Sequence, residues 1–599
     1  MKALRRLIPY FQPYRIQLAV GLGFVVLSAG FSSVVPWFLR RAVDALRAGV
    51  QPGVIWRIAA GMVAFALLAG GLRYAMRQLL NGVSRRIEYD LRNALFAHLA
   101  TLDAPFYGRM RTGDLMARLT NDLSAVRMAA GPAIMYLVNT IAGGVFALYF
   151  MIRIDLRLTL LAVLPMVFLP PVMARVGTAI HRRFEAVQEH FSTLTTRAQE
   201  NLAGTRIVRA YRQERAELAR FGGLNDEYLR RNMRLVRLWG MLSPLFGLLA
   251  GIGGVIVLGV GGSLVVTGSI SVGDFVAFGF YLAILTWPLI ALGWVINLFQ
   301  RGSASMARLN EILDARPAAA SPRVPRQLPR ASAGRSLEFR GVGFHYPTPP
   351  GTEPRWVLRD ISFVVPAGAT LGVVGATGSG KSALMDLVPR LYDPQEGEIL
   401  IDGVPIRELS LDALRAETGF VPQETLLFSD TIGANLAYGT EESGDARWAA
   451  GVAQLDETIA SFPGGYDTML GERGINLSGG QKQRAALARA LARKPSIVLL
   501  DDALSAVDTH TEAAILGELR GALAGRTAVI ASHRISAIRD ASWIIVLDEG
   551  RIVERGHHAE LLERGGRYWA LLRRQQLVES IEDEGEALAS TTARGTLSE

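Results

Sequence analysis

Cysteine is absent from this chain of 599 residues, and histidine occurs only eight times. Without thiols the chain forms neither disulfide bonds nor thiolate metal sites. The sequence also has no recognisable base-reading module, although its net charge of +10 would suit a nucleic-acid partner. Its arginines lie mainly between apolar runs, where lipid headgroups and cytoplasmic loops account for them better. We therefore expect no nucleic-acid partner.

Charged residues are scarce in the long apolar runs of the first 300 residues, whereas the later sequence is typical of a soluble α/β protein. A bilayer core about 30 Å thick requires about 20 apolar residues in a helix. The first run is too long for the apolar region of a signal peptide. We predict an all-α membrane domain with six spanning helices, at about residues 16–38, 54–77, 130–151, 157–178, 240–267 and 273–299.

The connections between these runs alternate in length. Short connections join the runs in pairs, and the two long segments, 77–127 and 182–237, are rich in arginine and patterned like amphipathic helices. The tendency of positive loops to stay inside places the long segments in the cytoplasm. The short loop that contains Arg40, Arg41 and Arg47 is an exception to this tendency. An even number of spans then places both termini in the cytoplasm.

Composition gives the remaining boundaries. Residues 316–336 are rich in Pro, Ala, Ser and Arg without periodicity, which predicts a linker. The acidic tail after about residue 577 is expected to be disordered. We divide the chain into a transmembrane domain (1–315), the linker (316–336), a soluble α/β domain (337–577) and the tail (578–599).

Prolines fall inside several predicted spans, including positions 165, 170 and 171 in the fourth and position 288 in the sixth. A proline inside a helix removes a backbone hydrogen bond, and membrane helices tolerate this where neighbours or a cavity satisfy the freed carbonyl. Tolerated kinks and a hinge or cargo-pocket role both remain open.

A glycine-rich loop follows a β-rich run at residues 369–374 and precedes a helix-like stretch. This strand, loop and helix have the spacing of a P-loop. Glycines let backbone N–H groups surround phosphates, and the helix N-terminus adds a favourable dipole. In this motif the lysine reaches the β- and γ-phosphates and the serine binds Mg²⁺. The predicted α/β P-loop nucleotide-binding domain thus contains the loop Gly375, Ala376, Thr377, Gly378, Ser379, Gly380, Lys381 and Ser382.

A second motif, at residues 496–501, has the pattern of a buried strand that ends in a carboxylate. Many strands end in aspartate, but a carboxylate at this position opposite a P-loop holds Mg²⁺. We therefore predict ATP and Mg²⁺ as cofactors, with Ser382 and Asp501 as metal ligands.

A third motif, Leu-Ser-Gly-Gly-Gln, precedes Lys-Gln-Arg and an Ala-rich helical run. By itself it predicts a helix N-cap. Together with the P-loop it resembles the ABC transporter superfamily, and the resemblance to type IV exporter half-transporters covers essentially the whole chain. This resemblance implies that two subunits close around ATP, and that one subunit's signature faces the γ-phosphate held by the other. The signature residues are Leu477, Ser478, Gly479, Gly480 and Gln481.

Further positions match the family in order. Tyr346 resembles the aromatic residue that stacks on adenine, which requires a flat π-face. Gln423 resembles the Q-loop residue that touches Mg²⁺ and the attacking water. His533 resembles the switch histidine at the γ-phosphate; a lone histidine is usually structural, but its position after a β-rich run favours the functional interpretation.

Shorter segments match the family as well. Gly471–Gly474 resembles the exporter X-loop, and Ser505–Asp508 the D-loop, whose Asp508 we include in the nucleotide site. Thr112–Leu115 with Arg118, and Glu200–Tyr211, resemble the segments around two cytoplasmic coupling helices. An ordinary Arg-rich amphipathic loop remains the alternative for these last segments.

One residue departs from the family pattern. Most ABC ATPases have glutamate directly after the Mg²⁺-binding aspartate, where its carboxylate polarises the attacking water; this chain has Asp502. A displacement of about 1 Å can cost about 10²-fold in a positioned reaction. We predict catalytic roles for Asp502, Gln423 and His533, with tight ATP binding but slow hydrolysis. The resemblance is closest to the degenerate-site subunit of bacterial heterodimeric multidrug exporters, and a slow homodimer is the alternative.

The resemblance implies ATP-driven export of hydrophobic or amphipathic compounds across the cytoplasmic membrane, and few charges inside the spans suit such cargo. Lipid flipping would use the same architecture. Peptide export is a weaker alternative, since no peptidase-like domain precedes the first span. A membrane-anchored P-loop kinase or regulatory ATPase would account for Lys381 and Asp501 but not for the signature or the six spans.

Overall fold

The computed structural model describes residues 3–577 except 168, 329–333, 349–350, 441–442, 472–473 and 475. For residues 166–167, 169–174, 242–243, 245–246, 249–250, 286–290 and 443 it describes the backbone alone. The predicted tail and the middle of the predicted X-loop lie outside the described residues. The chain forms two units, which are described separately. Unit 1 comprises Met1–Ala100 and Arg111–Ala315, and unit 2 comprises Thr101–Met110 and Arg316–Glu599.

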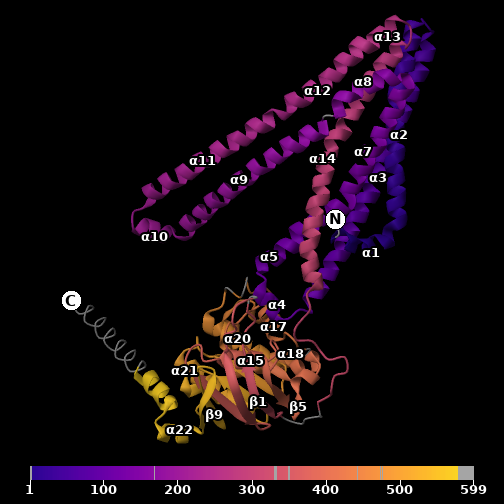
Figure 1. The fold of residues 1–599 in the computed structure, drawn as a ribbon. Coiled ribbons are helices and arrows are strands. Elements are labelled where there is room, and N and C mark those ends of the chain that lie inside the picture. Colours follow the sequence, from indigo (N-terminus) through magenta and orange to yellow (C-terminus); the bar gives the residue numbers. More distant parts are fainter. Residues whose placement is uncertain are drawn as a thin grey trace. The chain divides into compact units, whose positions relative to one another are not determined.

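Unit 1 is built of helices (Figure 1). Among the described residues, three helical stretches are long and apolar enough to cross a membrane: Ala3–Arg47, Pro52–Leu99 and Thr112–Ile154. The second stretch has 48 residues, so at about 1.5 Å per residue it extends well beyond a bilayer core of about 30 Å. Shorter apolar stretches lie in the predicted fourth, fifth and sixth spans, at Leu156–Pro165, Gly251–Val266 and Val272–Leu285. The helical character is confirmed, and the number of spans stays a prediction.

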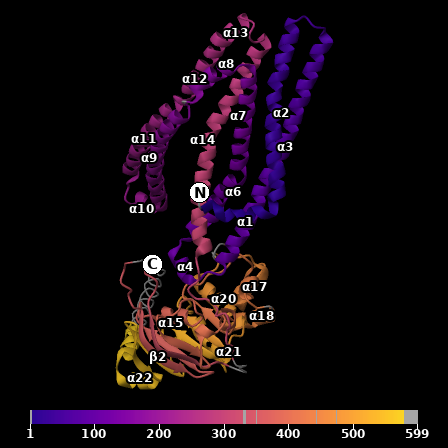
Figure 2. The same ribbon diagram turned by 45° about the vertical axis from the view of Figure 1, so that its right-hand side comes forward.

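The helices of unit 1 separate into two groups. Helices α2, α3, α7 and α14 pack on one another, whereas α9 and α11 lie side by side as a hairpin with α10 at its tip (Figures 1 and 2). The predicted helical character of the long Arg-rich segments is therefore confirmed. The helices are α1 (Ile8–Phe11), α2 (Arg15–Arg47), α3 (Pro52–Leu99), α5 (Thr112–Ala117), α6 (Leu123–Met128), α7 (Ile134–Ile154), α8 (Leu156–Val167), α9 (Leu169–Ala203), α10 (Thr205–Ala210), α11 (Glu214–Gly240), α12 (Leu242–Ile256), α13 (Gly262–Val266) and α14 (Val272–Asp314).

Helix α14 shows how local sequence fixes a helix end. Ser271 caps its first turn, accepting from the backbone N–H of Asp274, whose side chain in turn accepts from the Ser271 N–H. This reciprocal pair satisfies two donors that a helix start leaves free. Pro288 lies inside α14, yet the helix continues to Asp314, and Pro165 lies inside α8.

Unit 2 contains, in its described part, two β-sheets. The larger sheet has the order β10-β9-β3-β8-β7-β6 and the smaller one β2-β1-β4-β5. Strands β9, β3, β8, β7 and β6 run parallel, and β10 is antiparallel to β9. The strands are β1 (Leu337–Phe344), β2 (Leu358–Val365), β3 (Thr370–Gly375), β4 (Glu396–Ile401), β5 (Val404–Pro405), β6 (Thr418–Val421), β7 (Ile497–Asp501), β8 (Thr527–Ala531), β9 (Trp543–Asp548) and β10 (Arg551–Gly556).

Helices cover the larger sheet, which explains its buried strands. Along β7, Val498 and Leu500 join the core that contains α20 and α21, whereas Ile497 and Leu499 join the core that contains α15 and the smaller sheet. Parallel strands covered on both faces are apolar at every position. The helices of unit 2 are α4 (Ala104–Arg109), α15 (Lys381–Leu387), α16 (Leu411–Ala416), α17 (Ile432–Leu436), α18 (Ser443–Val452), α19 (Asp456–Ser461), α20 (Gly479–Ala492), α21 (Thr509–Leu523) and α22 (His558–Arg564).

A buried arginine at the end of the predicted linker joins the two sheets. Arg335 is 4% exposed. Its guanidinium donates to Asp402, which follows β4, at 2.8 Å and to Glu417, which precedes β6, at 2.7 Å. The described parts of the linker contain no helix or strand.

Candidate nucleotide site

The parallel strands of the larger sheet carry four of the predicted motifs to one edge. The glycine-rich loop follows β3, His533 follows β8, Asp501 ends β7, and Gln423 follows β6, and these strands are neighbours in the sheet. The carboxyl ends of parallel strands meet at a common edge, which is where open α/β sheets bind ligands. Motifs that lie up to about 160 residues apart in the sequence are thereby brought together.

Glycine is required at specific positions of the loop. A Cβ atom on Gly375 would lie 2.2 Å from the carbonyl oxygen of Leu547. Gly380 has φ +107°, and a Cβ there would lie 2.7 Å from the side chain of Leu358. Ala376, Thr377 and Gly378 are exposed at the crest of the loop, whereas the residues on both sides of them are buried. The crest of the loop is therefore open to a ligand, whereas both of its ends are fixed by packing.

Lys381 is directed back into this loop. Its Nζ donates to the carbonyl oxygens of Gly375 at 2.9 Å and Ala376 at 3.1 Å. The residue is only 6% exposed, and burial lowers the pKa of Lys381, while the carboxylates of Asp502 and Asp501 oppose this effect. An ammonium held over the loop by neutral acceptors is placed to bind an anion there.

Two of the residues predicted to hold a metal lie close to each other. The hydroxyl of Ser382 lies beside the carboxylate of Asp501, and Asp501 is 3% exposed. Burial raises the pKa of Asp501, and nearby Asp502 raises it further, whereas the Ser382 hydroxyl, Lys381 and His533 lower it. A buried carboxylate beside a hydroxyl fits Mg²⁺, which takes oxygen ligands from few protein groups together with substrate phosphates. Gln423 is exposed at the same edge.

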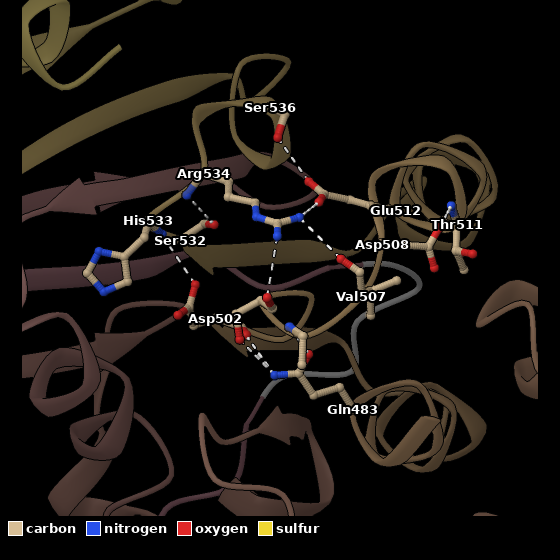
Figure 3. A network of polar contacts seen from close by, with 12 residues as sticks. Gln483, Asp502, Val507, Asp508, Thr511, Glu512, Ser532, His533, Arg534 and Ser536 are labelled. Atoms are coloured by element: carbon tan, nitrogen blue, oxygen red, sulfur yellow. Dashed lines mark hydrogen bonds and ion pairs between the residues drawn. The ribbon is translucent and has the colours of Figure 1, made fainter. Parts of the chain in front are cut away.

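Asp502 has a special backbone conformation. Its φ is +51°, in the left-handed region that aspartate tolerates better than most residues. Its backbone N–H donates to Ala531 at 2.9 Å, and its Oδ1 accepts from the backbone N–H of His533 at 3.3 Å (Figure 3). The carboxylate is therefore held against the chain that follows β8.

His533 lies next to both groups. Partial burial and the Lys381 ammonium lower the pKa of His533, and Asp502 and Asp501 oppose this shift. Its imidazole ring projects away from the network in Figure 3, whereas its backbone holds Asp502. The side chain is thus free of the contacts that the backbone makes.

Tyr346 follows β1 and lies among aromatic rings. It packs edge-on against Phe344 and Tyr392, with centroids 5.0 and 5.3 Å apart. Partial burial and the nearby Asp386 raise the pKa of Tyr346 to about 12. The residue is 38% exposed, so part of its surface is open to a ligand.

The signature residues lie at the start of α20. Leu477 is buried, and Ser478 caps the helix in a reciprocal pair with Gln481. A Cβ on Gly480 would lie 2.6 Å from the carbonyl oxygen of Ala506, so this glycine allows the helix start to approach the D-loop. Gly479 and Gly480 of the signature thus lie against Ala506 of the D-loop, and the Leu477 N–H donates to the carbonyl oxygen of Gly474 at 2.9 Å.

Two side chains hold the D-loop, Ser505–Asp508, from opposite sides (Figure 3). Gln483 of α20 donates to Ser505 Oγ at 2.8 Å and accepts from the Ala506 N–H at 2.8 Å. Arg534 donates to the carbonyl oxygen of Val507 at 3.3 Å and pairs with Glu512 of α21. Asp508 caps α21, accepting from the Thr511 N–H at 2.9 Å.

Sequence analysis did not identify Gln483, Arg534 or Asp386. Gln483 and Arg534 stand directly beside recognised motifs, and that adjacency was the available signal. Asp386 lies one turn after Ser382 in α15, a helix position that faces the same side of the site. Burial and the nearby Asp501 raise the pKa of Asp386 to about 6.

Of the predicted coupling segments, Thr112–Leu115 forms most of α5 and Glu200–Tyr211 includes α10. Arg118 donates to Glu311 of α14 at 2.7 Å. The structure adds a short helix that the sequence analysis missed, α4, which groups with unit 2. Asp103 caps α4 and also accepts from the backbone N–H of Ala319 at 3.1 Å. Aspartate two residues before proline was the available signal for this helix start.

Known proteins resemble both units of the chain. A family model described as ABC transporter transmembrane region matches residues 18–289, and one described as ABC transporter matches residues 358–505. The probable multidrug resistance ABC transporter ATP-binding/permease protein YheI of Bacillus subtilis (strain 168) is 38% identical over 96% of this chain and 98% of its own. The ATP-dependent lipid A-core flippase of Syntrophus aciditrophicus (strain SB) is 33% identical over 98% of this chain and 96% of its own.

A solved structure supports the same comparison. The structure of a bacterial Atm1-family ABC exporter with ATP bound matches this fold with a TM-score of 0.76 at 31% identity. The match covers 94% of this chain and 99% of the other. The helical unit and the nucleotide unit therefore both have counterparts in a single solved chain.

Proposed function

The chain belongs to the ABC transporter family, and from this membership we propose that it is one half of an ATP-driven exporter of hydrophobic or amphipathic compounds. Unit 2 is an ABC-type ATPase domain that binds ATP, and unit 1 is its membrane domain. Closure of two ATPase domains around nucleotide would switch the helices from inward-facing to outward-facing.

The observation that carries the proposal is the separation of two parts of the site within one chain. The glycine-rich loop, Asp501 and His533 share one sheet edge, whereas the signature start of α20 contacts the D-loop. A complete site therefore needs the signature of a second subunit. The signature of this chain, in return, would complete the partner's site.

Each residue then has a role in the shared site. Tyr346 stacks on adenine, the loop N–H groups and Lys381 bind the phosphates, and His533 contacts the γ-phosphate. Ser382, Asp501 and Gln423 would hold Mg²⁺, which supplies charge neutralisation at the β- and γ-phosphates when bound. Asp508 of the D-loop faces the partner.

The partner is a second, different half-transporter that supplies the catalytic glutamate. The Asp502 carboxylate is shorter than a glutamate and is held by the His533 N–H at 3.3 Å. Both features withdraw it from the position where a water would attack the γ-phosphate. The site on this chain's loop thus binds ATP and hydrolyses it slowly.

The cargo and the location follow from the membrane unit. Apolar helices suit a hydrophobic or amphipathic cargo, and the ATPase domain and both termini lie in the cytoplasm beneath the cell membrane. The similarity to a lipid A-core flippase makes lipid flipping the second candidate function. A homodimer is the second candidate assembly.

Transport in inside-out vesicles tests the exporter proposal. Vesicles that contain this chain and a neighbouring half-transporter should accumulate a fluorescent amphipathic dye when ATP is added. Lys381→Ala in this chain, combined with replacement of the P-loop lysine of the partner, should abolish the accumulation. Lys482→Ala serves as the control for a lost lysine. Accumulation that persists without the P-loop lysines, or ATP hydrolysis without any dye or lipid movement, would contradict the proposal.

Expression with and without the neighbouring half-transporter tests the assembly. We expect this chain alone to hydrolyse ATP slowly and the co-expressed pair to hydrolyse it at least tenfold faster. Full activity from the chain alone would overturn the heterodimer.

A further inference from the structure

An apolar groove runs along helices α2, α3 and α7 of unit 1. Its volume is about 430 Å³, within the range of about 300–1,000 Å³ that small-molecule sites occupy. The groove has aliphatic and aromatic walls, which include Val26, Phe31 and Val34 of α2, Phe65 of α3, and Phe146 of α7. Phe31 and Phe65 meet edge-on with centroids 5.5 Å apart. Such a groove fits a hydrocarbon chain and offers it no polar partner.

A second cavity of about 240 Å³ continues this groove, because Tyr149 and Phe150 line both. Its other walls include Arg40 of α2 and Arg153 of α7. One wall is Tyr281 of α14, whose ring stacks on Phe150 with centroids 5.2 Å apart. The combined space is therefore apolar along its length and cationic at one end.

The neighbouring acidic groups leave positive charge at that end. Arg40 Nε pairs with Asp274 at 2.9 Å and more loosely with Asp44 at 4.0 Å. Asp44 also accepts from Ser271 Oγ at 2.8 Å and from the Gly273 N–H at 2.9 Å, at the start of α14. Arg153 is exposed, and no described residue forms an ion pair with it. Its guanidinium is available to an anion.

The cationic end lies at a boundary of the membrane unit. Arg40 is near the end of α2, Arg153 is the penultimate residue of α7, and α14 begins at Val272. Trp37 also lines this cavity, and Arg41 lies over its ring at 3.8 Å. Tryptophan, tyrosine and arginine gather at membrane–water interfaces. A lipid whose acyl chain lies in the groove would thus have its headgroup at the same depth as the headgroups of neighbouring lipids.

We propose that the groove of α2, α3 and α7 and the adjoining cavity of Arg40 and Arg153 together bind an anionic membrane lipid, with an acyl chain on Phe31 and Phe146 and a phosphate on the two arginines. A soluble anion would leave the apolar walls uncovered, and a lipid without net negative charge would leave the positive charge of Arg153 unbalanced. The proposal concerns a resident membrane lipid and so goes beyond the proposed export of cargo.

Photolabelling of the assembled transporter tests this proposal. The probe is phosphatidylglycerol with a diazirine on one acyl chain, added in trace amounts to vesicles of phosphatidylcholine, and the labelled peptides are mapped by mass spectrometry. We expect labelling in residues 26–34 and 145–150. A phosphatidylcholine probe with the same chain should label them less.

Matched variants test the contribution of the arginine charge and that of the apolar groove separately. Arg153→Gln should lower phosphatidylglycerol labelling about fivefold, as expected for about one basic residue near an anionic lipid. Arg57→Gln, an exposed arginine near the start of α3 outside the groove, should leave it unchanged. Val34→Trp should fill the groove and lower labelling by both probes. ATP hydrolysis and gel filtration confirm that each variant is assembled.

Several outcomes would overturn the proposal. Groove peptides that stay unlabelled would mean that a partner subunit covers this face. Equal labelling by both probes, or no effect of Arg153→Gln, would show that the site does not select an anionic headgroup. Displacement of the probe by an excess of transported dye would assign the groove to cargo instead of lipid.

Discussion

Asp502 is the residue on which the proposal of a slow site depends. Its carboxylate is bound by a backbone N–H of the segment that carries His533, and its left-handed φ of +51° fixes where the side chain starts. A longer acid at the same position would extend past this N–H toward the loop. The length of this single side chain therefore sets the rate that we expect at this site.

Asp502→Glu should raise ATP hydrolysis at the site on this chain's loop by up to about 10²-fold, because about 1 Å of reach can matter that much. The measurement is ATPase activity of the assembled pair in which the partner's P-loop lysine is replaced, so that only this site turns over. Asp502→Asn, which keeps the shape and removes the charge, should abolish the residual rate. An unchanged rate in Asp502→Glu would count against the slow-site proposal.

Asp386 gives a pH-dependent prediction. Burial and the nearby Asp501 raise its pKa from 3.8 to about 6, so the folded state favours the protonated acid. Wild-type protein should lose stability as the pH rises from about 4 to about 6, and the loss, at most about 3 kcal/mol, should persist above pH 6.

Asp386→Asn should therefore melt at a higher temperature than wild type at pH 8 and at nearly the same temperature at pH 4. The melting temperature of the nucleotide-free protein in detergent tests this, with Glu563→Gln as an exposed control. If Asp386→Asn raises the melting temperature equally at pH 4 and pH 8, ionisation of Asp386 is not the cause of the difference.

At the scale of elements, helix α20 contributes to two places at once. Its start carries the signature that we assign to the partner's nucleotide, and Gln483, near that start, binds the D-loop of its own chain. Because the helix is rigid, a shift of its start is passed to Ser505 and Ala506. The D-loop and the signature should therefore move together.

Gln483→Ala would remove the side-chain acceptor of the Ala506 N–H, and the loss of such a hydrogen bond costs about 0.5–1.5 kcal/mol. We expect a lower melting temperature and a lower kcat for ATP in the assembled pair, with KM changed less because the P-loop is untouched. Lys482→Ala on the same helix should change neither value. A lower melting temperature with an unchanged kcat would show that the role of Gln483 is purely structural.

Several elements of this fold could be predicted from the sequence because their signals are local. The strand, glycine loop and helix at 369–387, the buried strand that ends at Asp501, and the N-cap at Ser478 all follow from neighbouring residues. The helical membrane unit and the ATPase domain are confirmed, and the long Arg-rich segments are helical in the structure. The subtype with a degenerate site and a different partner stays a proposal.

The remaining features depend on contacts between distant segments. Gln483 binds residues more than 20 positions away, and Arg335 binds Asp402 and Glu417 from across two sheets. A short helix such as α4 is difficult to recognise because six residues give too little periodicity. Arg153 shows no signal in the sequence, since its cavity is formed by three separate helices.

On the scale of the whole molecule, Arg335 determines how firmly the two sheets of unit 2 are joined. Loss of one partner of a buried ion pair costs about 3–5 kcal/mol, so Arg335→Ala should lower the melting temperature clearly. Arg340→Ala, which removes an exposed pair with Glu338 and Glu398, should cost about 0–1 kcal/mol.

The pH dependence of this network has a definite sign. The bond from Arg335 lowers the pKa of Glu417 below its ordinary 4.5, so the stabilisation is present above about pH 4.5 and is lost as the pH falls further. Arg335→Ala should show a smaller acid-induced loss of stability than wild type. Parallel acid curves for the two proteins would contradict this coupling.

An asymmetric transporter should respond unequally to equivalent mutations. In the assembled pair, Ser478→Ala in this chain should reduce total ATP hydrolysis more than Lys381→Ala in this chain, because under our proposal Ser478 serves the partner's faster site and Lys381 only the slow one. Steady-state ATPase of the two variants, beside the mirrored substitutions in the partner, measures the difference. Equal losses would indicate two equivalent sites.

The hydrogen bonds from Lys381 to its own loop have a consequence for the proposed binding of nucleotide. Two carbonyl oxygens already hold the ammonium at 2.9 and 3.1 Å, and the curvature of the loop is set by glycines that have no room for a side chain. In the proposed site a triphosphate would take over this proton donor from neutral oxygens that bind it less strongly. Such an exchange would demand no rebuilding of the backbone, because the glycines fix the shape of the loop independently of the lysine.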